Sequence, residues 1–349
     1  MPKTRQWKLK QKPEGAVTEE RLVDIFELCE GDTPPLENGK VLLKVVALSN
    51  DPSQRLWIDP SMTPERLYRP PVPLGDVMHS VGLAQVVESR SAQLVEGDWV
   101  TTFPGWTEFA VIDATACQIA KDLPNGLSKT LHTGILGVSG YTGFFGLTEV
   151  CKATKDDIVI VSGASGMVGS TVVQVAKKVI GCRRVVAIAG GAEKCRWVEH
   201  LGADVCLDYK SHRFQDDLYK ETRGPLAPTV YTDYVSGDIL DLVIPRLANH
   251  ARVCVTGGMS TYNTSTPFKG PQSWYDIVKL RLNINGFSVF DFAPKFEQAS
   301  ALLLKAIVEG KLDVGDVETK VHAPFEQIPN VWLRQYNGGK KGKLITWIV

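Results

Sequence analysis

The first 130 residues show short apolar runs separated by glycine and proline, a pattern typical of β-strands. Strands are predicted at residues 41–48, 81–88, 98–103 and 106–112. Closely spaced strands with such turns favour a barrel-like β domain. A proline-rich loop, residues 52–73, follows the first strand and carries aromatic and basic side chains. A loop of this length favours one wall of a binding cleft over a passive connection.

The pattern changes near residue 133, where short apolar strands begin to alternate with helical segments. The predicted strands are residues 158–161, 185–189, 204–208, 231–235, 252–256 and 282–289. Helices are predicted at residues 136–150, 193–201, 214–222 and 239–247. This alternation predicts an α/β fold with a doubly wound parallel sheet, which binds ligands at the carboxyl ends of its strands.

The end of the chain is predicted to form a helix at residues 296–309 and then strand-like pieces that end at 343–348. We expect these last strands to return to the β domain. The predicted organisation is therefore a β domain in residues 1–132, a doubly wound domain in 133–293, and a return to the β domain in 294–349.

A glycine-rich turn lies between the strand at 158–161 and a helix that follows without a linker. Its residues are Gly163, Ser165, Gly166, Met167, Val168 and Gly169. A strand, a glycine turn and a helix start in direct succession indicate dinucleotide binding, because glycines let the backbone approach a pyrophosphate at the helix N-terminus. The alternative is an ordinary tight turn.

The second strand of the doubly wound domain ends without a carboxylate, which favours NADP(H) over NAD. An acid at that position would hold the ribose 2′-hydroxyl of NAD. A basic residue, Lys194, follows a turn of small residues that includes Gly190, and Tyr209 follows the third strand. Both side chains suit a 2′-phosphate. The alternative is that Lys194 is a solvated helix residue and Tyr209 caps the sheet.

Composition excludes several classes of function. The 349 residues carry 39 basic and 39 acidic side chains, so no net charge favours nucleic acid or an anionic membrane. Seven cysteines are scattered without metal-ligand spacing, which predicts reduced thiols and no metal site. No apolar run has the length of a membrane helix, and the first residues do not read as a signal peptide. We expect a cytoplasmic protein.

Several segments together resemble the zinc-free branch of the medium-chain dehydrogenase/reductase superfamily, with its leukotriene B4 12-hydroxydehydrogenase/prostaglandin reductases and alkenal double-bond reductases. The similar segments are residues 136–147, 162–169, 190–194, 207–210, 257–263, 286–290 and 337–343. The resemblance implies a GroES-like β domain beside a Rossmann domain. It also implies that NADP(H) contacts Gly190, Lys194, Tyr209, Ser260, Tyr262, Phe287, Val289 and Asn337.

The family's chemistry is the reduction of an enal or enone by NADPH. Hydride adds to the β-carbon, negative charge grows on the carbonyl oxygen, and a hydrogen-bond donor at that oxygen stabilises the transition state. Tyr262, after the fifth strand, is our candidate donor. The alternative is that Tyr262 only packs against the cofactor, whose ribose hydroxyl then donates. We expect structural roles for His79 and His132.

The substrate pocket is expected to differ from that of the family, because Ser53 replaces a tyrosine that often lines it. The loop and its neighbours supply the candidate pocket residues Asp51, Ser53, Arg55, Trp57, Tyr68 and Met78. They favour an apolar α,β-unsaturated carbonyl substrate. A quinone reductase, an alcohol dehydrogenase and a non-catalytic NADPH-binding protein remain alternatives. Residues 282–290 are expected to pair with a second copy in a homodimer.

Overall fold

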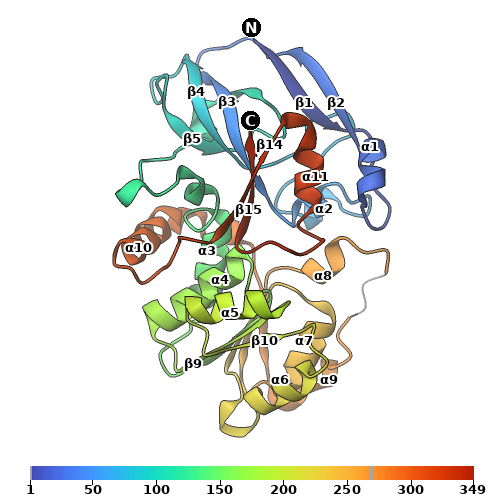
Figure 1. The fold of residues 1–349 in the computed structure, drawn as a ribbon, viewed down its shortest axis with the longest axis vertical. Coiled ribbons are helices and arrows are strands. Elements are labelled where there is room, and N and C mark those ends of the chain that lie inside the picture. Colours follow the sequence, from blue (N-terminus) through green and yellow to red (C-terminus); the bar gives the residue numbers. More distant parts are fainter. Residues whose placement is uncertain (1, 267–269) are drawn as a thin grey trace. The chain divides into compact units, whose positions relative to one another are not determined.

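The computed structural model describes residues 2–266 and 270–349, which divide into two compact units (Figure 1). Unit 1 contains Met1–Gly134, Tyr262–Ser265 and Thr319–Val349. Unit 2 contains Ile135–Thr261 and Thr266–Glu318. The chain therefore returns to unit 1 twice, first for four residues that include Tyr262 and then for its last strands.

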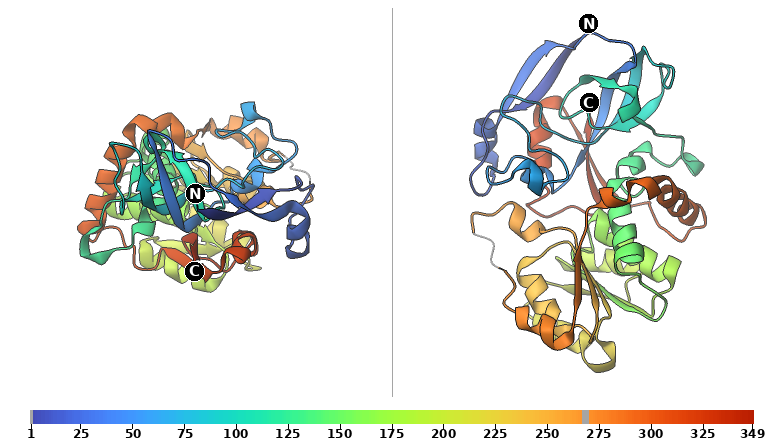
Figure 2. Two further views of the ribbon diagram at one scale, coloured as in Figure 1. Left: turned by 90° about the horizontal axis from the view of Figure 1, so that it is seen from above. Right: turned by 180° about the vertical axis from the view of Figure 1, so that it is seen from behind.

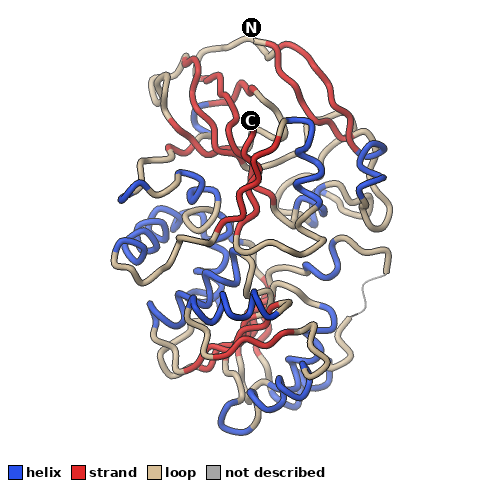
Figure 3. Tube along the Cα trace, in the orientation of Figure 1, coloured by secondary structure: helices blue, strands red, loops and turns tan. Residues whose placement is uncertain are grey.

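Unit 1 is built mainly from antiparallel strands, which Figure 3 shows in red. One sheet has the order β14-β15-β3-β4-β5-β7, and β6 also pairs with β3. Two further strands, β1 (Lys3–Leu9) and β2 (Phe26–Asp32), pair with each other. The strands of the larger sheet are β3 (Lys40–Asn50), β4 (Gly82–Ser89), β5 (Trp99–Thr102), β6 (Phe109–Asp113), β7 (Gln118–Ile119), β14 (Glu318–Ala323) and β15 (Lys343–Ile348).

The core of unit 1 is aromatic. The rings of Phe26 and Trp106 lie 4.9 Å apart, and Trp332 lies 5.9 Å from Trp106. All three are buried, and they bring together segments from the two ends of the chain. The short helices of this unit are α1 (Leu22–Ile25), α2 (Gln54–Trp57) and α11 (Ile328–Leu333).

Unit 2 contains the predicted parallel sheet, in the order β10-β9-β8-β11-β12-β13. Every pairing in this sheet is parallel. The order in which the chain adds strands reverses between β8 and β11: β9 and β10 lie on one side of β8, and β11, β12 and β13 lie on the other. Ligands of doubly wound sheets bind at such a reversal. The strands are β8 (Ile158–Val161), β9 (Arg184–Ala189), β10 (Val205–Asp208), β11 (Val230–Asp233), β12 (Arg252–Val255) and β13 (Asn283–Gly286).

Helices cover both faces of this sheet. Side chains of α6 (Phe214–Thr222), α7 (Gly237–Val243) and α9 (Trp274–Leu280) pack on one face. Figure 2 shows these three helices together on that side of the sheet. The other helices lie on the opposite side in both views (Figures 1 and 2). These are α3 (Val138–Phe145), α4 (Met167–Gln174), α5 (Ala192–Leu201) and α10 (Phe296–Val308). The four-residue α8 (Met259–Tyr262) ends where the chain enters unit 1.

The structure differs from the predicted return to the β domain at residue 294. Helix α10 belongs to unit 2, because the ring of Phe296 lies 4.8 Å from that of Tyr141 on α3. The Gln174 amide also donates to the carbonyl oxygen of Asp313 at 3.1 Å. The return therefore occurs at Thr319. The first division, after Gly134, lies two residues from the predicted one. None of the helices in the described residues has the length and apolar character needed to cross a bilayer.

Candidate active site

The predicted glycine turn links β8 to α4 in unit 2. Gly163 has a φ of +59°, a conformation that favours glycine, and Gly166 is the residue before the helix. A Cβ added to Gly169 would lie 2.5 Å from the carbonyl oxygen of Gly163. The first turn of α4 can therefore approach the end of β8 only because residue 169 has no side chain. Ser165 and Val168 are half-buried in this turn, and Met167 is buried.

A buried carboxylate, Asp233 at the end of β11, supports this turn. It accepts hydrogen bonds from the Ser162 hydroxyl at 2.7 Å and the Tyr231 hydroxyl at 2.8 Å. The backbone N–H groups of Val235 and Ser236 donate to it as well. The Ser162 hydroxyl also accepts a hydrogen bond from the backbone N–H of Tyr234. Through Ser162, Asp233 therefore links the end of β8 to the end of β11, the two strands between which the strand order reverses.

Two lysines, Lys194 and Lys210, lie near each other at the end of β9. Lys194, on the first turn of α5, is half-buried, and burial and the nearby Lys210 ammonium lower its pKa. The ring of Tyr209 lies against Gly190. The carboxylate of Asp208 accepts from the backbone N–H groups of Gly191 at 2.7 Å and Lys210 at 3.0 Å. Two lysines and a phenol are a donor set suited to a phosphate dianion, so these residues fit NADP(H).

The other predicted cofactor residues lie in both units. In unit 2, the Ser260 hydroxyl donates to the carbonyl oxygen of Val235 at 2.6 Å, so it holds the loop after β11. Val289 is buried, and the ring of Phe287 lies 5.8 Å from that of Phe292. In unit 1, Asn337 is exposed in the loop before β15. Their roles toward a cofactor stay predictions.

Tyr262 is held by unit 1 through the residue that follows it. The Asn263 amide accepts from the backbone N–H of Val17 at 2.7 Å and donates to the carbonyl oxygen of Val17 at 3.0 Å. This pair of hydrogen bonds fixes the backbone beside Tyr262. Tyr262 lies close enough to Tyr68 and Tyr336 for its charge state to affect theirs.

Three tyrosines therefore gather in unit 1 beside the loop that carries Ser53. The Tyr68 hydroxyl donates to the Ser53 hydroxyl at 2.9 Å, and the Tyr336 hydroxyl donates to the carbonyl oxygen of Pro52 at 3.0 Å. Burial holds the pKa of Tyr336 well above its usual value. Burial also raises the pKa of Tyr68, so the Tyr68 and Tyr336 phenols remain protonated near neutral pH and are hydrogen-bond donors.

Asp51 anchors this loop. It forms an ion pair with Lys343 of β15 and accepts a hydrogen bond from the Ser49 hydroxyl. Burial opposes ionisation of Asp51, but the Lys343 ammonium outweighs that effect and holds the pKa of Asp51 below its usual value. The Lys343 side chain is only 4% exposed. Asp51 is therefore an ionised loop anchor.

Three predicted pocket residues are buried in unit 1. Trp57 and Met78 are buried in the hydrophobic core of unit 1. Arg55 is 2% exposed, pairs with Asp59 at 3.2 Å and donates to the carbonyl oxygen of Gly15 at 2.7 Å. Their side chains take part in packing and in internal hydrogen bonds, and their place in a substrate pocket stays a prediction.

The two histidines singled out in the sequence are both partnered. His132 Nε2 lies 2.9 Å from the carbonyl oxygen of Lys121, and His79 Nδ1 accepts from the Arg69 guanidinium at 3.2 Å. Burial lowers the pKa of both, that of His79 to about 4. Among the described residues, no three His, Cys, Asp or Glu side chains cluster as metal ligands would.

Known proteins are similar to this chain over nearly its whole length. A sequence profile for the N-terminal domain of oxidoreductase matches residues 5–120, and one for zinc-binding dehydrogenase matches residues 168–305. The NADPH-dependent curcumin reductase of Escherichia coli (strain K12) is 32% identical over 349 residues, covering 98% of this chain and 96% of that protein. The chain belongs to the medium-chain dehydrogenase/reductase superfamily.

Further comparisons place this medium-chain oxidoreductase in the zinc-free branch that the sequence resembles. Prostaglandin reductase 1 of Bos taurus is 31% identical over 323 residues, covering 92% of this chain and 93% of that protein. The crystal structure of CurA from Vibrio vulnificus, in complex with NADPH, superposes with a TM-score of 0.87 at 29% identity and covers 99% of both chains. The predicted family and two-domain fold are thus confirmed.

Three residues of this oxidoreductase that bear on the site were not among the sequence candidates: Lys210, Asp233 and Tyr336. Lys210 directly follows Tyr209, so its place in the turn after β10 was a usable signal. Asp233 lies within the predicted strand at 231–235 and is the last residue of the observed β11. Tyr336 acts through a contact with Pro52, which lies 284 positions away, and no local pattern reveals such a contact.

Proposed function

We propose that this protein is a reductase that transfers hydride to the activated carbon–carbon double bond of an α,β-unsaturated carbonyl compound. Its cofactor is NADPH, which the relatives' names specify and the residues of unit 2 fit. The observation that carries the proposal is the grouping of Lys194, Lys210 and Tyr209 at the end of a strand that lacks a carboxylate. The E. coli curcumin reductase and the bovine prostaglandin reductase support the reaction class.

The residues of unit 2 hold the cofactor. The backbone of the glycine turn, with α4 behind it, takes the pyrophosphate, and Lys194 and Tyr209 take the 2′-phosphate. Asp233 keeps the turn in shape through the Ser162 hydroxyl. When bound, NADPH supplies the hydride that adds to the β-carbon of the substrate.

Unit 1 supplies the groups that polarise the substrate. Tyr262 donates a hydrogen bond to the carbonyl oxygen, where the electron pair of the broken π bond collects as an enolate. Tyr68 stands beside Tyr262 and binds the same face of the substrate. A proton from solvent then adds to the α-carbon. The substrate thus gains one hydride and one proton and becomes a saturated carbonyl compound. Because conjugation activates the β-carbon, the reaction requires a donor at oxygen and no acid stronger than tyrosine.

A substrate panel tests this reaction. Purified enzyme is mixed with NADPH and an aliphatic 2-alkenal, an aryl enone, a cyclic enone or a quinone, with NADH as control, and products are identified by mass spectrometry. We expect saturated carbonyl products with NADPH and at least tenfold lower kcat/KM with NADH. Turnover confined to the quinone, or alcohols as products, would contradict the proposal. Tight NADPH binding without turnover on any member would support a cofactor-binding protein instead.

We also propose that the enzyme is a homodimer joined through β13, the edge strand of the parallel sheet. All four residues of β13 are exposed, and the neighbouring α9 exposes Trp274 and Tyr275, at 66% and 70%. An apolar surface beside an open strand edge is a template for a second copy. Light scattering after gel filtration should give twice the chain mass of 38.3 kDa, and a monomer would contradict this.

The cytoplasm is the proposed location. All seven cysteines carry free thiols in the structure, which supports a reducing compartment. Fractionation of cells that express the chain should recover NADPH-dependent reductase activity in the cytosolic fraction.

A further inference from the structure

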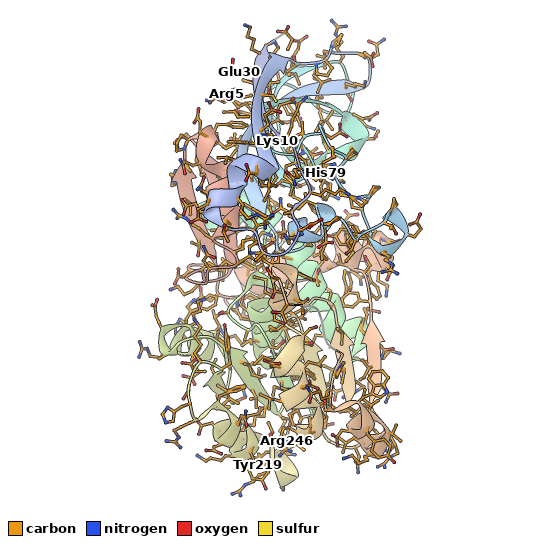
Figure 4. The ribbon with its side chains drawn as sticks, turned by 90° about the vertical axis from the view of Figure 1, so that its right-hand side faces the viewer. Arg5, Lys10, Glu30, His79, Tyr219 and Arg246 are labelled. Carbon is orange, nitrogen blue, oxygen red and sulfur yellow. The ribbon has the colours of Figure 1, made fainter. Side chains whose placement is uncertain are left out.

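Two cysteines of unit 2 face each other between α5 and β10. Cys195 lies in the first turn of α5 and is buried, and Cys206 lies in β10 and is half-buried. Leu207, the next residue of β10, packs on one face of the sheet with side chains of α6, the helix that carries Tyr219 in Figure 4. Because neighbouring residues of a strand point to opposite faces, the Cys206 side chain lies on the other face, which α5 covers.

A hydrogen bond holds the two segments together beside this pair. Glu199 lies one turn after Cys195 on the same side of α5, and its carboxylate accepts from the backbone N–H of Cys206 at 2.9 Å. The two thiols are also hydrogen-bonded to each other, with Cys206 as the donor and Cys195 as the acceptor. Their sulfur atoms are thus neighbours, and both thiols are free.

The two thiols differ in reactivity. The hydrogen bond from Cys206 lowers the pKa of Cys195, although burial and two nearby carboxylates oppose its ionisation. The dipole of α5 acts in the same direction as the hydrogen bond, because a thiolate is stabilised near a helix N-terminus. The hydrogen bond raises the pKa of Cys206, which keeps its proton. A nucleophilic thiol beside a protonated one is the arrangement in which an oxidised sulfur is converted to a disulfide.

A second pair of hydrogen-bonded thiols, Cys151 and Cys254, provides a contrast. Both of its members have an exposed fraction of 0%. Cys206 is only half-buried, so a small oxidant in solvent reaches the pair that it forms with Cys195. Solvent access therefore separates the two pairs, and the buried pair is an internal control.

The pair of Cys195 and Cys206 joins the two segments that carry the expected phosphate ligands. Lys194 directly precedes Cys195, and Tyr209 lies just beyond the end of β10. A disulfide brings its two sulfur atoms to about 2.05 Å, much closer than a hydrogen bond does. Closing it draws the first turn of α5 toward β10 and shifts Lys194 relative to Tyr209. The phosphate site is thereby distorted.

We propose that Cys195 and Cys206 form a thiol–disulfide switch that responds to hydroperoxides and weakens NADPH binding when it closes. The Cys195 thiolate attacks the O–O bond of the hydroperoxide and becomes a sulfenic acid, while the alkoxide leaves and takes up a proton. The Cys206 thiol then attacks that sulfur, and water leaves as the S–S bond forms. The two thiols lose two electrons, which reduce the hydroperoxide to an alcohol and water.

The chemical step can be read from one peptide. Cleavage after lysine releases residues 195–210, which contain both cysteines of the switch. The reduced protein is treated with hydrogen peroxide, its remaining thiols are alkylated after denaturation, and the peptide mass is measured. We expect residues 195–210 to be unalkylated and lighter by two hydrogen atoms, with Cys151 and Cys254 alkylated. Alkylation of both Cys195 and Cys206 after peroxide treatment overturns the inference.

The effect on the cofactor is measured by titration with NADPH after the peroxide is removed. We expect the Kd for NADPH to rise about tenfold on oxidation, as for the weakening of a charged hydrogen bond, and to recover with dithiothreitol. Cys206→Ser keeps a hydroxyl donor but cannot form the disulfide, so peroxide should change its Kd less than about twofold. Cys206→Ala provides a second such variant.

Two outcomes of the titration overturn the inference. One is an unchanged Kd for NADPH in wild-type protein that carries the disulfide. The other is an equal rise of the Kd in peroxide-treated Cys206→Ser. The inference goes beyond the proposed reaction, and neither the peptide mass nor the Kd involves a substrate. A failure of the proposed reaction would therefore be seen separately, in the substrate panel.

Discussion

The ring of Tyr209 rests on Gly190: a methyl group built on Gly190 would lie 2.7 Å from ring atom Cε1. This close approach places the phenol hydroxyl at the end of β9, where Lys194 also stands. The absence of a side chain at residue 190 and the presence of a phenol at 209 are thus two parts of one site.

Gly190→Ala should displace the Tyr209 ring and weaken the binding of NADPH but not that of NADH. Because that ring is 48% exposed, it can swing outward with little loss of stability. We expect KM for NADPH to rise about tenfold, as for the loss of one hydrogen bond to a charged group, with kcat/KM for NADH nearly unchanged. Steady-state kinetics with both cofactors measures this. Gly31→Ala, where an added methyl group meets nothing within 4 Å, is the control.

Lys194→Ala should remove most of the preference for NADPH over NADH. The positive charges of Lys194 and Lys210 repel each other, and a bound phosphate dianion offsets this repulsion. KM for NADPH is expected to rise about 10- to 100-fold, and its dependence on ionic strength should weaken. The exposed Lys220, on α6, provides the matched control variant. If the ratio of kcat/KM for NADPH to kcat/KM for NADH is unchanged in Lys194→Ala, residues other than Lys194 bind the 2′-phosphate.

Asp51→Asn should destabilise unit 1. The change removes the carboxylate that pairs with the Lys343 ammonium, whose side chain is 4% exposed, and the loss of one partner of a buried ion pair costs about 3 kcal/mol. Urea unfolding followed by fluorescence measures the change in the free energy of unfolding. Glu37→Gln breaks the exposed pair with Lys40 and should not shift the midpoint. Equal midpoints for the two variants would show that the Asp51–Lys343 pair contributes no more than a surface pair.

The neutral His79 predicts a pH dependence of stability. In the unfolded chain a histidine takes a proton near pH 6.5, whereas burial keeps folded His79 neutral down to about 4. The unfolded state therefore binds more protons in this window, and stability is full above pH 6.5 and falls as the pH drops from 6.5 to 4. His79→Gln keeps an acceptor for Arg69 and should flatten this slope, in thermal melts across that range. In this variant His132, whose pKa is also lowered by burial, still contributes to the pH dependence of stability.

The sequence predicted unit 2 well because its signals are local. The strand at 158–161 and the helix at 214–222 have the predicted bounds, since each is a short run with a clear period between turn residues. The turn at Gly163 and Gly169 followed from the same local order. Strands β1 and β2 were missed because β2 is mostly exposed and shows no apolar alternation.

Contacts between distant residues account for what the sequence could not show. The Asn263–Val17 hydrogen bonds join positions 246 residues apart, so no pattern near Tyr262 places it in unit 1. Trp57 was predicted in the pocket because aromatic residues in a loop often contact ligands, and the burial of its side chain in the core of unit 1 could not be read from the sequence. Whether a side chain faces inward in an irregular loop depends on packing, which periodicity does not encode.

The fate of the transferred hydride tests the central claim most directly. The enzyme is incubated with an aryl enone and with NADPH that carries deuterium at C4 of the nicotinamide, prepared in each configuration, and the product is examined by NMR. The account predicts a saturated ketone with deuterium on the former β-carbon, from one of the two labelled cofactors. An alcohol with deuterium on the former carbonyl carbon would contradict it.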